Sequence, residues 1–137
     1  MSQSFELHPQ LAADTFLVGN LPLCRVLLMN ESLYPWLILV PQRNDISEIY
    51  QLSAAERTQV WEESDLVSRQ LMQLFKADKL NIAALGNVVP QLHLHHIVRF
   101  KTDAAWPAPV WGKFKPEAYT AEAADSLLQQ LRQALSI

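Results

Sequence analysis

Hydrophobic positions along the chain recur with two different periods, and the changes of period mark the predicted elements. Five segments have the length and apolar content of β-strands: 14–20, 24–30, 36–42, 79–85 and 91–100. Leu21 and Pro22 follow the first segment and indicate a turn before the second. The pattern therefore predicts three strands early in the chain and two more after residue 78.

Two further segments carry apolar residues at helical spacing. Ser53 and Glu56 fit a capping box, in which each side chain satisfies a free backbone amide at a helix start. A helix is predicted over about 53–76, and its buried face consists of Val60, Ser64, Val67, Leu71 and Leu74. Thr120 can cap a last helix. The apolar face of that helix consists of Ala124, Leu128, Leu131 and Leu135. This order of elements predicts an α+β fold with a mainly antiparallel sheet.

Composition narrows the class of protein. A chain of 137 residues, 50% hydrophobic and 18% charged, suits one domain over 1–137 with a sizeable core. No apolar run approaches the roughly 18 residues of a membrane helix, and the first ten residues lack a signal-peptide pattern. The one cysteine, Cys24, cannot form an internal disulfide, which favours the reducing cytoplasm.

Charge and glycine content exclude several kinds of site. The net charge of -3, without a long basic block, argues against a dedicated nucleic-acid binder. With only three glycines, the chain has neither a Walker-type phosphate loop nor a dinucleotide fingerprint. Any phosphate must therefore be bound by side chains and isolated backbone amides.

The last predicted strand holds three of the four histidines. Side chains alternate between the faces of a strand, so Gln91, His93 and His95 share one face. The opposite face is apolar apart from His96 and should pack under the long helix. We expect His96 to be a core or rim histidine with one hydrogen bond.

The pair of His93 and His95 has three interpretations. It is a solvated polar face, or part of a metal site, or a catalytic pair in which one ring attacks or shuttles protons and the other binds an anion. A metal site needs further ligands, and no other residue has a telling spacing, so we expect none. Random polar faces favour Lys, Glu and Thr over paired imidazoles, which favours the catalytic interpretation.

The segment Gln91–Ile97 resembles the motif of the histidine triad (HIT) family, His-φ-His-φ-His-φ-φ with φ apolar. The resemblance extends to "LLMNESLYPWLILVPQR", to "ISEIYQLSAAE" and to "LNIAALGNVVPQLHLHHIVRF" with the following "D-x-x-W-P-x-P-V-W". These segments are similar to those of bacterial members related to dinucleoside polyphosphate hydrolases. The resemblance implies a homodimer with a five-stranded antiparallel sheet and a long helix in each subunit.

The resemblance also implies a reaction and its residues. The family binds a nucleotide, often a purine, and attacks its α-phosphate. His93 would be the nucleophile, and His95 would donate a hydrogen bond to phosphate oxygens. Asn30 matches a position that contacts the ribose, Asn87 one that contacts phosphate or the leaving group, and Asn81 is a looser nucleotide-binding candidate. For each asparagine, turn or strand-end chemistry is the alternative. No cofactor is required, although Mg²⁺ can accompany a polyphosphate substrate.

The chain departs from the family pattern in three places, one of which is His96 in place of an apolar residue. Gln91 replaces the first histidine, and it can still orient His93 or touch phosphate but cannot titrate near neutral pH. Tyr34-Pro35-Trp36 stands where many members have Gly-His, and we expect Trp36 to be a core residue rather than a base-stacking surface. The alternative function is accordingly a weakly catalytic or non-catalytic nucleotide-binding dimer.

A loop over 101–116 is rich in proline and tryptophan. Trp106 and Trp111 either cover the nucleotide site, with Lys113 or Lys115 near phosphates, or fill the core or a dimer seam. We favour the core for Trp106, and the sequence leaves Trp111 open.

Overall fold

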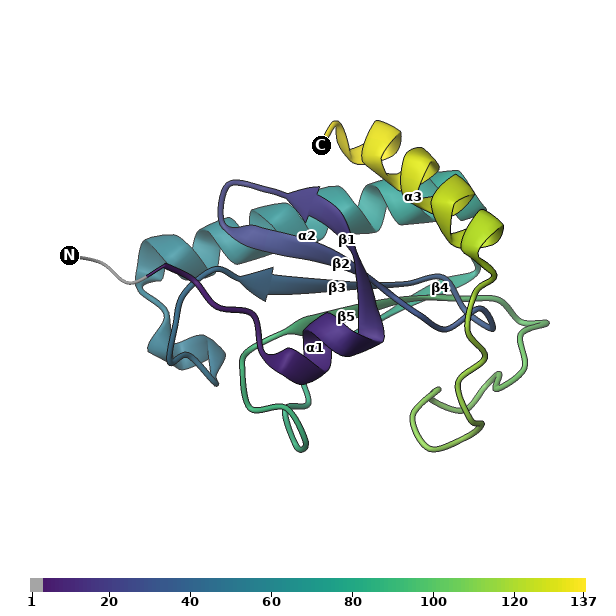
Figure 1. Cartoon of the computed structure of the whole chain (residues 1–137), viewed down its shortest axis with the longest axis horizontal. Helices are drawn as coiled ribbons and strands as arrows, with labels where there is room; N and C mark the ends of the chain where they lie inside the picture. The colour runs from purple at the N-terminus through teal and green to yellow at the C-terminus, as the bar shows by residue number, and fades with distance from the viewer. Residues whose placement is uncertain (1–3) are drawn as a thin grey trace.

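Five strands form one antiparallel sheet in the computed structural model, which describes residues 4–137. Their bounds are β1 Thr15–Asn20, β2 Cys24–Met29, β3 Trp36–Pro41, β4 Lys79–Ala83 and β5 Leu94–Arg99. They lie in the order β1-β2-β3-β5-β4 (Figure 1), so β5 is an interior strand between β3 and the edge strand β4. The predicted α+β fold with a five-stranded antiparallel sheet is confirmed.

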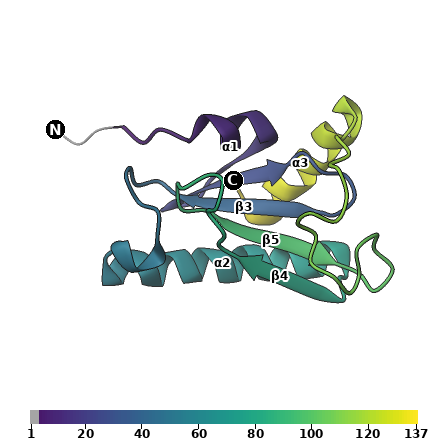
Figure 2. The same ribbon diagram turned by 90° about the horizontal axis from the view of Figure 1, so that it is seen from below.

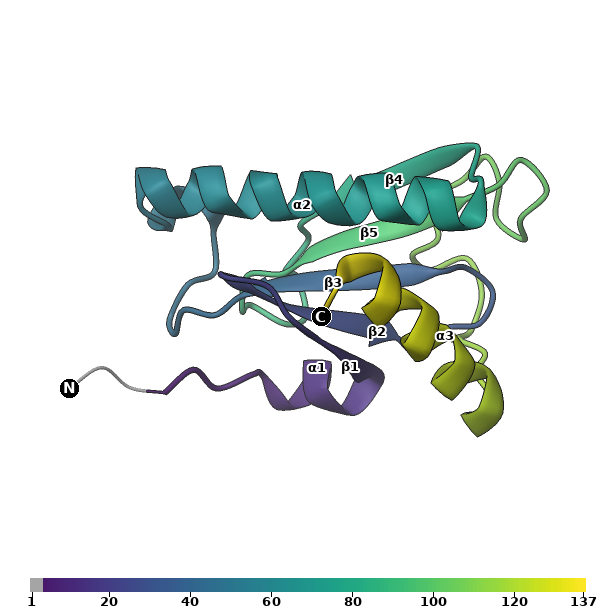
Figure 3. The same ribbon diagram turned by 90° about the horizontal axis from the view of Figure 1, so that it is seen from above.

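Helices cover both faces of this sheet. The long helix α2, Ala54–Phe75, lies along one face, and the short helix α1, Pro9–Asp14, lies on the other (Figure 2). The last helix α3, Ala121–Leu135, packs against α2 and β1 (Figure 3). Two elements were not predicted, namely α1 and the 3₁₀ turn Ile49–Gln51. Within residues 4–137, every helix is too short or too polar to span a lipid bilayer.

The start of α2 follows from the predicted capping box. The Ser53 hydroxyl accepts the backbone N–H of Glu56, and the Glu56 carboxylate accepts the backbone N–H of Ser53. Two amides that the first helical turn leaves without partners are thereby satisfied. The helix ends at Phe75, because Lys76 adopts a left-handed conformation with φ of 50°.

The buried face of α2 packs on one face of the sheet. Its residues Val60, Val67 and Leu71 belong to the same apolar cluster as Leu94 and Val98 of β5. The α2 residue Glu63 is also buried, and its carboxylate accepts the backbone N–H groups of residues 23 and 24 at 2.8 and 2.7 Å. A buried carboxylate is tolerated here because charge-assisted bonds replace its hydration.

His96 lies fully buried between β5 and α2. Its Nδ1–H donates to the carbonyl of Leu94 at 3.1 Å, and its Nε2 accepts the hydroxyl proton of Ser64 at 2.7 Å. The predicted core histidine therefore has two hydrogen bonds instead of one. Burial lowers the pKa of His96 to about 4, although the bond to the Leu94 carbonyl acts in the opposite direction.

The two late strands are shorter than predicted. The strand expected over 79–85 ends at Ala83, and the strand expected over 91–100 begins only at Leu94. Residues 91–93 therefore enter the sheet without strand pairing, which leaves their backbone groups free for other partners. The backbone carbonyl of Gln91, for example, bonds to the side chain of His93.

We expect His96→Gln to flatten the pH dependence of stability. The pKa of His96 is about 4 in the folded protein and about 6.5 in an unfolded chain. Between these values the unfolded chain binds more protons, so the free energy of unfolding falls as the pH falls from about 6.5 toward about 4. The difference is worth roughly 3 kcal/mol at most.

Glutamine retains an amide oxygen that can accept the Ser64 hydroxyl, but it does not titrate. Urea unfolding at pH 4.5 and pH 7.5 measures the loss in both proteins. The variant should lose less stability between these values than the unaltered protein. An equal loss in both would contradict the assignment of this pH dependence to His96.

Candidate active site

The pairing of β3 with β5 places the candidate residues on the face opposite α2. Ile38 lies directly across from His95, and Trp36 lies across from Ile97. Residues opposite each other in an antiparallel pair share a face, and diagonal neighbours remain within reach of aromatic side chains. Trp36 and His95 therefore project together from the α1 side of the sheet, where a second apolar cluster surrounds them.

A cavity of about 290 Å³ opens beside these side chains. His93, His95, Trp36 and Trp111 line it together. Helix α1 and the loop after β4 form its walls, through Gln10, Leu11, Asp14, Leu85, Gly86, Asn87, Val88 and Val89. Mostly apolar walls with a few converging polar groups are typical of a small-molecule site.

His93 is oriented by the backbone. Its Nδ1 lies 2.6 Å from the carbonyl oxygen of Gln91. A carbonyl oxygen can only accept, so Nδ1 carries the proton and donates it. In the neutral form of the ring, the lone pair lies on Nε2, for which residues 4–137 provide no hydrogen-bond partner. The neutral form of His93 thus offers an acceptor nitrogen on a side chain that lines the cavity.

His95 has the opposite protonation pattern. The indole Nε1–H of Trp36 donates to its Nδ1 at 3.0 Å, so the proton of the neutral ring lies on Nε2. Burial, with smaller effects of the neighbouring His93 and His96, lowers the pKa of His95 to about 3. The ring is consequently neutral at physiological pH and offers one N–H donor to a ligand.

The two imidazoles lie edge to face. The ring centroids of His93 and His95 are 4.9 Å apart, and those of His95 and Trp111 are 5.2 Å apart. Both histidines are only 6% exposed. The predicted polar row is therefore enclosed by aromatic rings and does not form a solvated face.

Trp111 reaches this position because the loop after β5 is tied down at its start. The buried guanidinium of Arg99 forms an ion pair with Asp103 at 2.8 Å and donates to the carbonyl of Ala108. Asp103 in turn accepts backbone N–H groups of residues 100, 105 and 106. Burial alone would raise the pKa of Asp103, but Arg99 and these amides lower it to about 2.

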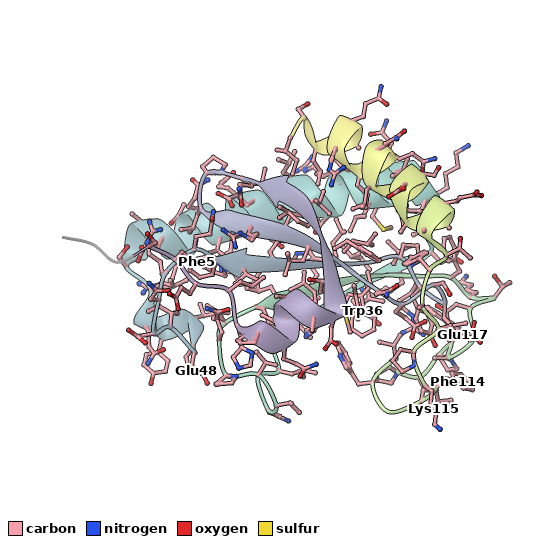
Figure 4. The ribbon with its side chains drawn as sticks, in the orientation of Figure 1. Phe5, Trp36, Glu48, Phe114, Lys115 and Glu117 are labelled. Carbon is pink, nitrogen blue, oxygen red and sulfur yellow. The ribbon has the colours of Figure 1, made fainter. Side chains whose placement is uncertain are left out.

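The other candidates from the loop lie apart from the cavity. Trp106 is partly exposed, and the Cζ atom of the Arg99 guanidinium lies over its ring, 5.6 Å from the ring centroid. Figure 4 shows Trp36 near the junction of α1 and β1, with Phe114 and Lys115 farther out on the loop. Lys113 and Lys115 are exposed and do not belong to the described cavity lining. Trp111 thus covers the site without them.

The histidines do not gather around one point. His96 faces α2, whereas His93 and His95 face the cavity. Within residues 4–137, no three His, Cys, Asp or Glu side chains come together as a metal site would require. The alternative of a metal held by all three histidines therefore has no geometric support.

A larger concavity of about 550 Å³ lies between the N-terminal segment and the turn at Asn44 and Asp45. It is more polar, and neither His93 nor His95 lines it. We take the smaller cavity as the candidate site, because both His93 and His95 line it.

Comparisons with known proteins agree with this geometry. The sequence profile of the HIT domain matches residues 10–102. The chain belongs to the HIT domain family. A histidine triad protein of Marinobacter aquaeolei VT8 is 51% identical over 98% of both chains, with a TM-score of 0.95. Histidine triad proteins of Bradyrhizobium japonicum and Sinorhizobium meliloti 1021 follow.

The Bradyrhizobium japonicum protein is 47% identical over 97% of this chain and 99% of its own, with a TM-score of 0.94. The Sinorhizobium meliloti protein is 41% identical over 95% of this chain and 96% of its own, with a TM-score of 0.92. The comparison with curated proteins gives no match. The HIT fold supports a nucleotide-binding or a hydrolase and transferase function for this chain.

Gln91, at the first position of the HIT motif, does not orient His93 through its side chain. Its Oε1 accepts the backbone N–H of His8 at 2.8 Å, and its Nε2 donates to the carbonyl of Glu6 at 2.9 Å. The side chain thus fastens the segment before α1, while the backbone carbonyl holds His93. The predicted orienting role belongs to the main chain of this residue.

Of the three asparagines predicted to bind nucleotide in this HIT domain, only Asn87 lines the cavity. The side-chain oxygen of Asn30 accepts the backbone N–H of Tyr119 at 2.9 Å, and that of Asn81 accepts from Arg99 at 2.8 Å. Both side chains therefore join elements of the fold, as the alternative of strand-end chemistry expected.

Sequence reasoning missed two contributions to this HIT site. Trp36 was expected to be core, and it is buried, but its N–H also fixes His95. Helix α1 was missed, although Pro9 is a favoured first helical residue and follows His8, whose Nδ1 accepts the backbone N–H of Gln10. Only six residues long, α1 is too short to show a hydrophobic period.

We expect Gln91→Ala to leave the tautomer of His93 unchanged, because the orienting carbonyl remains. The loss of two partly exposed hydrogen bonds should lower the free energy of unfolding by about 1 kcal/mol. Nitrogen-15 NMR of the histidine rings measures the first quantity, and urea unfolding measures the second. A His93 ring that loses its Nδ1 proton in this variant would show that the side chain sets the tautomer.

Proposed function

We propose that this HIT protein is a nucleotide hydrolase or nucleotidyl transferase that acts through a nucleotidyl-histidine intermediate on His93. The observation that carries the proposal is the bond from His93 Nδ1–H to the Gln91 carbonyl. It leaves the lone pair of the neutral ring on Nε2. The ring lines the cavity, where a neutral imidazole can act as a nucleophile.

In the first step, Nε2 of His93 forms a bond to the α-phosphorus while the bond from phosphorus to the leaving group breaks. The leaving group departs with the electron pair and takes a proton from water. The phosphorylated ring is cationic, because Nδ1 keeps its proton, and the short bond to the carbonyl stabilises that charge. Water then attacks phosphorus and releases a proton, which balances the proton taken up by the leaving group. The N–P bond breaks, its electron pair returns to Nε2, and a nucleoside monophosphate is released.

His95 supports the same step as a donor. The centroids of the His93 and His95 rings lie 4.9 Å apart. The Nε2–H of His95 would donate to a phosphate oxygen as negative charge develops there. Asn87 lines the cavity and supplies a further amide for phosphate or the leaving group. In this proposal, Asn30 and Asn81 act only through the elements that they hold.

The apolar walls suit the base and sugar of a nucleotide. Leu11, Ile38 and Val89 line the cavity. A phosphate group alone would not need these apolar residues, but a base can pack against them. The proposed substrate class is a purine nucleotide conjugate or a dinucleoside polyphosphate, as the family resemblance implies. Mg²⁺ would enter only with a polyphosphate. From the chain length we further propose one domain over 1–137, and from its one cysteine a cytoplasmic location. A homodimer is proposed because the family resemblance implies it.

The alternative is a nucleotide-binding dimer without turnover, since Gln91 replaces the first histidine of the motif. The side chain of Gln91 points to the N-terminal segment, whereas the carbonyl that orients His93 belongs to any residue at this position. This observation favours the enzyme over the binding protein.

We expect His93→Ala to abolish both turnover and the covalent intermediate. The loss of a nucleophile should reduce kcat by at least about 10³-fold. The unaltered protein and His93→Ala are mixed with adenosine and guanosine substrates, including a phosphoramidate and a dinucleoside polyphosphate. Intact-protein mass spectrometry then detects the covalent intermediate, and product release measures turnover. A mass increase of one nucleotide that is absent from His93→Ala would support the mechanism.

His96→Gln is the matched control, because it removes an adjacent histidine that faces α2. At pH 7.5 it should retain turnover. Tight nucleotide binding by the unaltered protein, with neither adduct nor turnover for any of these substrates, would replace the enzyme with the binding protein.

A further inference from the structure

We propose that Trp36 is a positioning residue that holds the His95 ring in one tautomer and one orientation, with its N–H directed into the cavity. This inference rests on the proposed function, in which His95 donates to the phosphoryl group. It assigns to Trp36 a task that its interpretation as a core residue does not include.

The first step is the chemistry of the contact. An indole N–H can only donate, so the nitrogen 3.0 Å away must be an acceptor. His95 Nδ1 can accept only when it carries no proton, and the neutral ring then carries its proton on Nε2. The contact is buried on both sides, with Trp36 and His95 each 6% exposed, so water does not compete for it.

The second step is the orientation of the ring. A half-turn of the imidazole about its bond to Cβ would place a carbon where Nδ1 now lies. The indole N–H would then be buried without an acceptor, which is costly in an apolar setting. Trp111 makes T-shaped contacts with both rings, with centroids 5.2 Å from His95 and 5.8 Å from Trp36.

The third step is the division of roles between neighbouring rings. The Gln91 carbonyl forces a proton onto Nδ1 of His93, and Trp36 forces it off Nδ1 of His95. Two chemically identical side chains therefore present a lone pair and an N–H, respectively. A phosphoryl group needs both, one for attack on phosphorus and one for an oxygen. Trp36 is the only indole with a hydrogen bond to either ring in residues 4–137.

The test uses the full-length protein and three variants. Trp36→Phe keeps an aromatic ring but removes the N–H. Trp111→Phe is the matched control, because it makes the same change in another indole that contacts His95 but donates it no hydrogen bond. Trp36→His restores a ring N–H on a smaller side chain and tests for rescue. Long-range nitrogen-15 NMR reports the tautomer of His95, and steady-state kinetics report kcat and KM separately.

We expect His95 to be the Nε2–H tautomer in the unaltered protein and in Trp111→Phe, and to lose this single state in Trp36→Phe. In that variant kcat should fall about 10- to 100-fold, since a donor aimed at developing charge is lost in part. The fall in kcat should exceed any change in KM, and Trp36→His should recover part of it.

Three results would overturn the inference. One is an Nδ1–H tautomer, or a mixture of tautomers, for His95 in the unaltered protein. This measurement does not depend on the folding of any variant. Another is a folded Trp36→Phe with an unchanged tautomer. The third is a kcat of Trp36→Phe within about threefold of the unaltered value. If the unaltered protein shows neither turnover nor adduct, the proposed function fails, and the tautomer measurement alone decides the role of Trp36.

Discussion

The alternation of side chains along β5 is the constraint on which both halves of the molecule depend. His95 and His96 are neighbours in the chain, yet a strand sends them to opposite faces. His96 faces α2 and packs between this helix and the sheet, whereas His95 faces the cavity. A shift of one residue in the pairing of β3 with β5 would exchange these environments and bury His95 under the helix.

The last residue of β5 fixes the loop that carries Trp111 to the cavity. Arg99 is the last residue of the strand and one of the largest fully buried side chains. Its charge is compensated by Asp103 and by oxygens of Asn81 and Ala108, and its planar group lies between the rings of Tyr34 and Trp106. Such a group is tolerated only when every donor finds a partner. It thereby gives an irregular loop a fixed path to Trp111.

The elements that could be predicted are those that the chain states locally. The capping box at Ser53 and Glu56 and the long apolar face of α2 needed no knowledge of the rest of the fold. Strand ends were harder, because the period of two in 91–98 continues through residues that have no pairing partner. The short helix α1 carries a single buried residue, Leu11, so its register leaves no periodic trace.

The candidate site shows the same division. His93, His95 and Asn87 could be predicted from a motif and its spacing. The donor to His95 could not, because Trp36 is 59 residues away and meets it only through the register of two strands. Likewise, no sequence feature distinguishes the side chain of Gln91, which binds the N-terminal segment, from its carbonyl, which binds His93.

The attachment of α1 has a consequence for how a ligand enters. This helix forms one wall of the cavity, yet it has six residues, one buried side chain and a tether at Gln91. Elements with so few buried contacts open at a small fraction of the free energy needed to unfold a domain. The wall formed by α1 should therefore open more readily than the interior strand β5, which carries His95. Backbone amides of α1 would exchange with solvent long before those of β5, and the residue at the first motif position would set the difference.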